Sequence, residues 1–126
     1  MIDYATAGDL LVAYGRAWET FNGDAWVALF TEDAEYHGDP FGAPLVGHNA
    51  LRAFMLESAE TQRDVEFTVE RHWVSGSTVL AAWHASWTLR ADGSLVRASG
   101  FMTADIAPDD RISRFHEWWM LAPSGG

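Results

Sequence analysis

Hydrophobic positions in the first half of the chain recur at helical spacing. Over residues 6–21 they fall on one helical face, which predicts a helix. Asn22-Gly23 favours the end of that helix, because both residues tolerate a left-handed cap. Asp24 suits the N-cap of a short second helix. A third helix is expected after Gly47, and its apolar face carries Leu51, Phe54, Met55 and Ser58.

The second half alternates apolar and polar residues with a period of two, which predicts strands. Before them, Glu35-Tyr36-His37 is expected to be a short extended segment, and Asp39-Pro40-Phe41-Gly42 has the composition of a turn. The expected strands cover 65–69, 79–89, 95–106 and 111–121, joined by short turns. Such hairpins form an antiparallel sheet. Helices followed by strands therefore predict an α+β fold with the helices on one sheet face, and a curved sheet leaves a pocket between the layers.

Length and composition narrow the class of protein. The chain has 126 residues, which predicts one domain over 1–126. It is 48% hydrophobic with seven Trp, which excludes a disordered chain. Without Cys there is no disulfide framework, thiolate metal site or thiol nucleophile. The start, Met1-Ile2-Asp3-Tyr4, has no basic region, so a cytoplasmic location is expected. The end, Pro123-Ser124-Gly125-Gly126, is expected to be a frayed tail.

The charge balance argues against polyanionic partners. Eight Arg and no Lys oppose eighteen acidic residues, for a formal net charge of −10. Nucleic-acid binding needs clustered cations, and so does binding to an anionic membrane, so neither partner is expected. The five His have no recognised metal-ligand spacing, and the Gly residues form no phosphate-binding motif. Neither a metal nor a cofactor is expected.

The order of elements, together with three stretches of sequence, resembles a known superfamily. Residues 23–54 read GDAWVALFTEDAEYHGDPFGAPLVGHNALRAF, and ASGFMTADI and DDRISRFHEWW occupy the last two expected strands. These pieces resemble the SnoaL-like and ketosteroid isomerase-like branch of the nuclear transport factor 2-like superfamily. The resemblance implies a cone-shaped, cystatin-like fold of three N-terminal helices on a curved antiparallel sheet. It also implies a homodimer formed through the outer sheet face.

The resemblance carries roles onto particular residues. The Asp of the isomerases' Asp-Pro-Phe-Gly loop is a general base, and here it is Asp39. The isomerases' oxyanion Asp falls at Met102, whose thioether cannot donate a hydrogen bond. Their oxyanion Tyr falls near Arg16, with Tyr14 as the nearest phenol. An alternative for Asp39 is a structural role, in which its carboxylate caps the turn that it begins.

Strand alternation and the resemblance together predict an aromatic pocket with Asp39 at one side and Glu117 deeper. An alternative is a strand register shifted by one residue, which would place Glu117 in solvent. Burial against aromatic rings raises the pKa of a carboxyl group, so these two acids are expected to divide the roles of base and acid. Tyr14 or His37 is expected to donate a hydrogen bond to a substrate oxygen. The expected substrate-binding residues are Trp18, Phe54, Met55, Trp83, Trp87, Met102, Phe115 and Trp119.

The predicted function is cofactor-independent proton transfer on an apolar, ring-containing carbonyl compound: isomerisation, cyclisation or dehydration. Two alternatives remain open. An epoxide hydrolase-like reaction would require Arg16 to face the pocket. A non-catalytic ligand-binding or dimerisation module is the other alternative, and it is favoured if Trp83, Trp87 and Trp119 fill the pocket.

Overall fold

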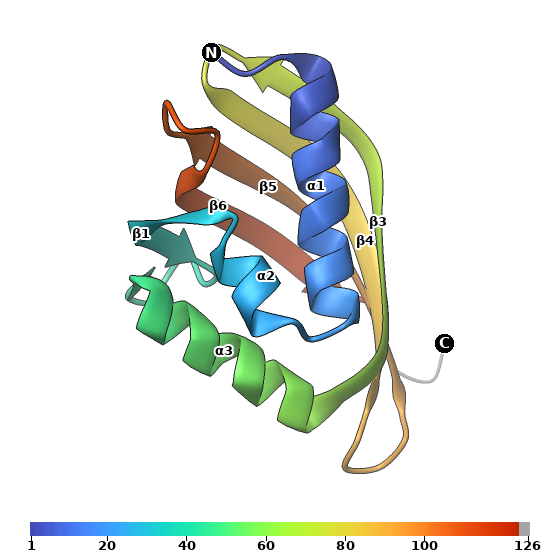
Figure 1. Cartoon of the computed structure of the whole chain (residues 1–126). Helices are drawn as coiled ribbons and strands as arrows, with labels where there is room; N and C mark the ends of the chain where they lie inside the picture. Colours follow the sequence, from blue (N-terminus) through green and yellow to red (C-terminus); the bar gives the residue numbers. More distant parts are fainter. Residues whose placement is uncertain (124–126) are drawn as a thin grey trace.

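A six-stranded sheet carries three helices on one of its faces (Figure 1). The computed structural model describes residues 1–123, so the tail expected after Pro123 lies outside the described residues. None of the described helices is long and apolar enough to cross a membrane. In chain order the elements are α1 Tyr4–Glu19, α2 Gly23–Val27, β1 Phe30–His37, β2 Leu45–Val46, α3 His48–Thr61, β3 Gln62–Ser75, β4 Thr78–Leu89, β5 Leu95–Ile106 and β6 Ile112–Leu121.

The strands lie in the order β2-β1-β6-β5-β4-β3. The meander from β3 to β6 is antiparallel, as predicted, and confirms the α+β class. The expectation of an entirely antiparallel sheet is wrong, because β1 pairs with β6 in parallel, with Tyr36 opposite Phe115. These two strands are far apart in sequence, so no hairpin fixes their direction. The short segment expected at residues 35–37 is part of this longer strand.

The helix ends differ from the predicted ones in two places. The left-handed residue after α1 is Phe21, with φ of 50°, and not Asn22 or Gly23. Asn22 is the N-cap of α2, and its side-chain oxygen accepts a hydrogen bond from the Ala25 backbone N–H at 3.0 Å. The predicted cap, Asp24, lies instead in the first helical turn. Asn and Asp cap equally well, so composition alone did not separate them.

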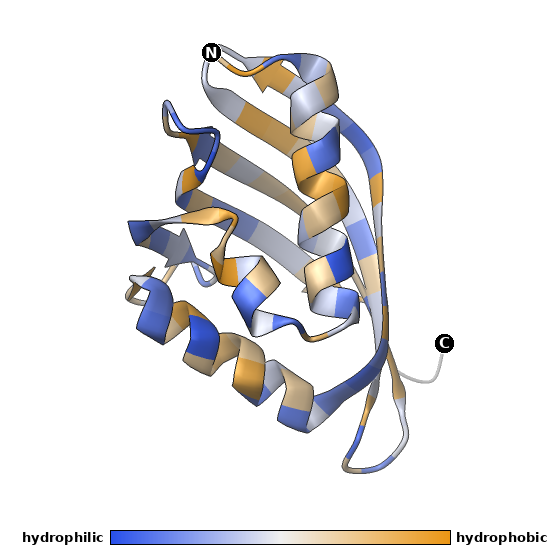
Figure 2. Cartoon of the chain, in the orientation of Figure 1, coloured by the Kyte–Doolittle hydropathy of each residue, from blue (hydrophilic) through white to orange (hydrophobic). Residues whose placement is uncertain are grey.

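Alternation along β4 determines which side chains face the helices. Val79, Ala81, Trp83 and Ala85 are all buried, whereas His84 between them is exposed. Figure 2 shows hydrophobic and hydrophilic positions alternating along the middle of β3, at the edge of the sheet. Gly100 of β5 is the register partner of Trp83, and a Cβ there would lie 2.5 Å from the indole. The indole therefore lies flat over this glycine and forms part of the inner wall of the sheet.

Candidate functional site

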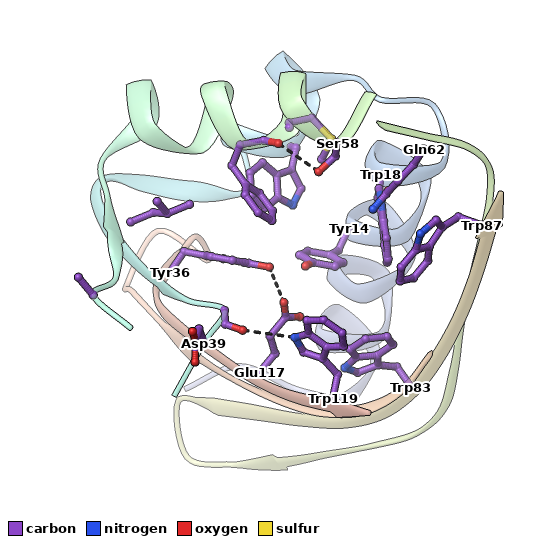
Figure 3. Close-up of a pocket in the computed structure, with 16 residues that line it drawn as sticks. Tyr14, Trp18, Tyr36, Asp39, Ser58, Gln62, Trp83, Trp87, Glu117 and Trp119 are labelled. Carbon is purple, nitrogen blue, oxygen red and sulfur yellow. Dashed lines mark hydrogen bonds between the residues drawn. The ribbon is translucent and has the colours of Figure 1, made fainter. Parts of the chain in front are cut away.

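An open cavity of about 350 Å³ lies between the helices and the sheet (Figure 3). The Trp side chains thus wall a cavity and do not fill it. The charged side chains that line it are Asp39 and Glu117. Such a surface favours an apolar ligand that carries little charge. Its aromatic lining residues are Tyr14, Trp18, Trp26, Tyr36, Phe54, Trp83, Trp87 and Trp119.

Glu117 brings a carboxyl group into the aromatic part of the cavity. Its place on β6, two residues after the buried Phe115, confirms the predicted strand register. The hydroxyl of Tyr36 donates a hydrogen bond to Glu117 Oε1 at 2.7 Å (Figure 3). Removal from water raises the pKa of Glu117 from 4.5 to about 7, and the hydrogen bond from Tyr36 opposes that rise. Near neutral pH this carboxyl group can therefore both take up and release a proton.

Two phenols are held beside Glu117 by one buried ring. Phe115 stacks on Tyr36 with ring centroids 5.0 Å apart and on Tyr14 with centroids 5.4 Å apart. Burial, and then the negative charge of Glu117, raise the pKa of both tyrosines well above 10. Both phenols consequently stay protonated at neutral pH and remain hydrogen-bond donors.

Asp39 lies at the edge of the cavity, in an exposed turn (Figure 3). Its Oδ1 accepts a hydrogen bond from the Phe41 backbone N–H at 2.9 Å. Its backbone carbonyl accepts another from the Gly42 N–H at 3.1 Å. This geometry is the turn-capping alternative considered for the Asp-Pro-Phe-Gly segment. Glu117 lies deeper and is surrounded by aromatic rings, which is the desolvated environment expected for a general base.

The expectation that His37 serves the pocket is wrong. Its ring lies on the opposite side of the sheet, stacked on His116 at 4.1 Å, and its Nε2 is 3.0 Å from Glu35 Oε1. Alternation along β1 explains the error, because the neighbouring Tyr36 takes the inward position. The signal was present in the sequence, since Ala34 and Tyr36 form the apolar side of this strand.

Met102 and Phe115 do not line the cavity, contrary to expectation. Each is about 1% exposed and packed in the core. Met102 pairs with Ala81 on β4 and with Glu117 on β6, but its own side chain is covered, and the residues of β4 that line the cavity are Trp83 and Trp87. Phe115 lies behind the two tyrosines that it supports.

The remaining expected residues lie where the sequence suggested. Tyr14, Trp18, Phe54, Met55, Trp83, Trp87 and Trp119 all line the cavity, and their contact with a ligand stays a prediction. Sequence reasoning overlooked two polar residues of the lining, Tyr36 and Gln62. Gln62 follows α3 directly and begins β3. No turn signal marks that junction, so β3 begins earlier than the strand expected from residue 65.

Arg16 is exposed and lines a separate groove between α1 and β3. It is therefore not available to hold a water molecule beside Glu117, as the hydrolase alternative required. In the described part of the chain, no group of three His, Asp or Glu side chains is arranged to hold a metal ion.

Comparison with protein families gives a match over residues 11–115 to the family described as a SnoaL-like domain. None of the curated proteins matches the sequence significantly. Among solved structures, the chain is similar to the epoxide hydrolase/cyclase-like enzyme SalBIII, which has a role in pyran ring formation in the polyether salinomycin. That similarity has a TM-score of 0.83 and 20% identity, and it covers 95% of each chain.

Two further structures have the same fold. A hypothetical protein from Catenulispora acidiphila, with a ketosteroid isomerase-like fold and in complex with trimethylamine, has a TM-score of 0.79 and 15% identity over 87% of this chain and 84% of that one. A computationally designed 17-OHP binder has a TM-score of 0.78 and 18% identity over 94% of this chain and 98% of that one. These likenesses confirm the cone-shaped fold that the sequence resemblance implied.

Proposed function

The chain belongs to the SnoaL-like domain family, and from this premise we propose that it is a cofactor-independent enzyme that transfers protons on a small, apolar carbonyl compound. The proposal rests on one observation: Glu117 lies inside an aromatic cavity, where burial raises the pKa of its carboxyl group to about 7. A general base with a pKa near the working pH is both available and strong enough to act. Similar folds occur in an epoxide hydrolase/cyclase-like enzyme and in a designed binder of 17-OHP.

The proposed reaction begins with a carbonyl compound between the Trp side chains. The Glu117 carboxylate removes a proton from the carbon next to the carbonyl, and the C–H electron pair forms an enolate. The Tyr14 hydroxyl donates a hydrogen bond to the developing enolate oxygen. Tyr36 holds Glu117 through its 2.7 Å hydrogen bond. In an unsaturated ketone, the enolate is conjugated, and return of the proton from Glu117 to its far carbon shifts the double bond. In a compound with a second carbonyl group, attack of the enolate on that carbonyl closes a ring, and the new alkoxide takes the proton from Glu117.

Enolisation can be tested without knowledge of the natural substrate. A neutral two-ring ketone, cyclohexylcyclohexanone, is incubated with the protein in deuterium oxide, and deuterium uptake beside its carbonyl is followed by NMR. The expected result is exchange well above that in buffer alone. Exchange no faster than in buffer, for this ketone and a panel of larger apolar ketones, would contradict the proposed function.

The variant Asp39→Asn tests which of the two carboxyl groups of the cavity acts as the base. Asparagine retains an oxygen that can accept the hydrogen bond from the Phe41 backbone N–H, so the turn is expected to keep its shape. Because Glu117 remains the base, we expect the exchange rate to change by less than about tenfold, well below the usual contribution of a general base. A loss of a hundredfold or more with the fold intact would return the role of base to Asp39.

We also propose that two copies of the chain pair through the outer sheet face. On that face Trp118 is 44% exposed and Trp73 is 37% exposed, with Phe101 in register with Trp118. Clustered exposed aromatic residues of this kind are typical of an interface. Sedimentation at micromolar concentration is expected to give a dimer, and Trp118→Glu a monomer. A wild-type protein that sediments as a monomer would contradict this proposal.

A further inference from the structure

A second polar group lies at the end of the cavity opposite Glu117. Gln62 is the first residue of β3, and its backbone N–H donates to the Ser58 carbonyl at the end of α3. The backbone is therefore fixed by both the helix and the strand. Figure 3 shows the Gln62 side chain beside Trp18, across the cavity from Glu117.

The orientation of the Gln62 amide follows from its neighbour. Trp18 Nε1 donates a hydrogen bond to Gln62 Oε1 at 2.9 Å. An indole N–H can only donate, so the amide oxygen must face Trp18 and the amide nitrogen must occupy the other position. Trp18 itself is packed against Trp87 and Phe67, with ring centroids 5.6 and 5.9 Å away. Within residues 1–123 the amide nitrogen of Gln62 has no hydrogen-bond partner.

The other hydroxyl at this end does not compete for a ligand oxygen. Ser58 Oγ donates its proton to the Phe54 carbonyl at 3.0 Å. Gln62 thus supplies two free N–H donors in a region otherwise walled by aromatic rings. A ligand oxygen placed there would be neutral, because the charged lining residues are the two acids Asp39 and Glu117, which repel an anion.

We infer that Gln62 determines specificity, by donating a hydrogen bond to a second acceptor oxygen at the end of the ligand remote from Glu117. The ligand class is then a neutral, apolar compound with two acceptor oxygens, such as a diketone or a keto-ether. This inference rests on the proposed function, which places the first carbonyl group beside Glu117. Gln62 acts on binding alone and takes no part in the proton transfer.

The test compares two probes of the same shape. One is cyclohexylcyclohexanone, and the other is the matched diketone in which the second ring also carries a carbonyl group. Binding is measured by quenching of Trp fluorescence. We expect the diketone to bind about three- to tenfold more tightly than the monoketone, the usual contribution of one neutral hydrogen bond. Gln62→Met keeps the length of the side chain but removes the donors, and it should abolish this preference while the monoketone still binds.

Two further variants sharpen the test. Gln62→Glu keeps an acceptor for Trp18 but presents no amide donor, so it should also abolish the preference for the diketone. Ser58→Ala, at the same end of the cavity, should retain that preference. Two results would overturn the role of Gln62 and leave the proposed function standing. In the first, Gln62→Met still prefers the diketone. In the second, the wild type binds the monoketone and shows no preference for the diketone. If neither ketone binds and the larger ketones of the panel show no exchange either, the proposed function fails, and the role of Gln62 fails with it.

Discussion

Replacing Glu117 by Gln is expected to slow deuterium exchange of the probe ketone by about two to four orders of magnitude, the usual contribution of a general base. Gln has the shape of Glu and an oxygen that can accept the hydrogen bond from the Tyr36 hydroxyl, so the cavity should stay intact. The amide cannot take up the proton from carbon. Exchange is measured by NMR with saturating ketone, and retention of the fold is checked by circular dichroism.

The matched control is Glu57→Gln, on the exposed side of α3, which should exchange at the wild-type rate. The pH dependence is a second signature of the same group. Because only the carboxylate acts as a base, the wild-type rate should rise with pH and level off above the pKa of about 7. A Glu117→Gln variant that exchanges within tenfold of the wild type would contradict the assignment of the base.

Glu117 is also expected to make the protein less stable as the pH rises. Its pKa is 4.5 when the side chain is fully solvated, as in the unfolded chain, and about 7 in the folded protein. The folded state therefore binds the proton more tightly, and the free energy of unfolding falls between these two values. The whole shift corresponds to a loss of roughly 3 kcal/mol in the free energy of unfolding. Below about pH 4.5 none of this stability is lost, and above about pH 7 all of it is lost.

The measurement is urea denaturation of the wild type and of Glu117→Gln at about pH 5 and about pH 8. Gln does not titrate, so the difference in unfolding free energy between the two proteins isolates Glu117 from the other acids. The variant should gain stability relative to the wild type at the higher pH. An equal pH dependence in the two proteins would show that this carboxyl group is not desolvated.

The inner wall of the sheet could be predicted because alternation is a local property. Trp83, Trp87 and Glu117 face the helices, as the period of two required. The parallel pairing of β1 with β6 could not be predicted in this way, since it joins segments about 80 residues apart, as in the Tyr36–Glu117 hydrogen bond. Alternation alone places Tyr36 and not His37 on the inner face, but only the pairing of β1 with β6 brings Tyr36 beside Glu117.

For Asp39, the sequence motif is compatible with two different roles and so does not predict which one the residue has. The sequence Asp-Pro-Phe-Gly is suited equally to a catalytic loop and to a simple turn. The exposure of the carboxylate and its bond to the Phe41 backbone favour the turn, and the catalytic role of Asp39 stays a prediction that Asp39→Asn tests. Likewise, seven Trp can fill a cavity or wall one. The outcome depends on how the helices are spaced across the sheet, which no local pattern describes.

The central claim is that Glu117 exchanges a proton near neutral pH inside the cavity. It is tested most directly by following the side-chain carboxyl carbon of Glu117 by NMR across a pH titration, with Glu117→Gln used to assign the signal. The predicted result is a single titration with a midpoint at about pH 7. A midpoint near 4.5, the value for a carboxyl group in water, would contradict the account.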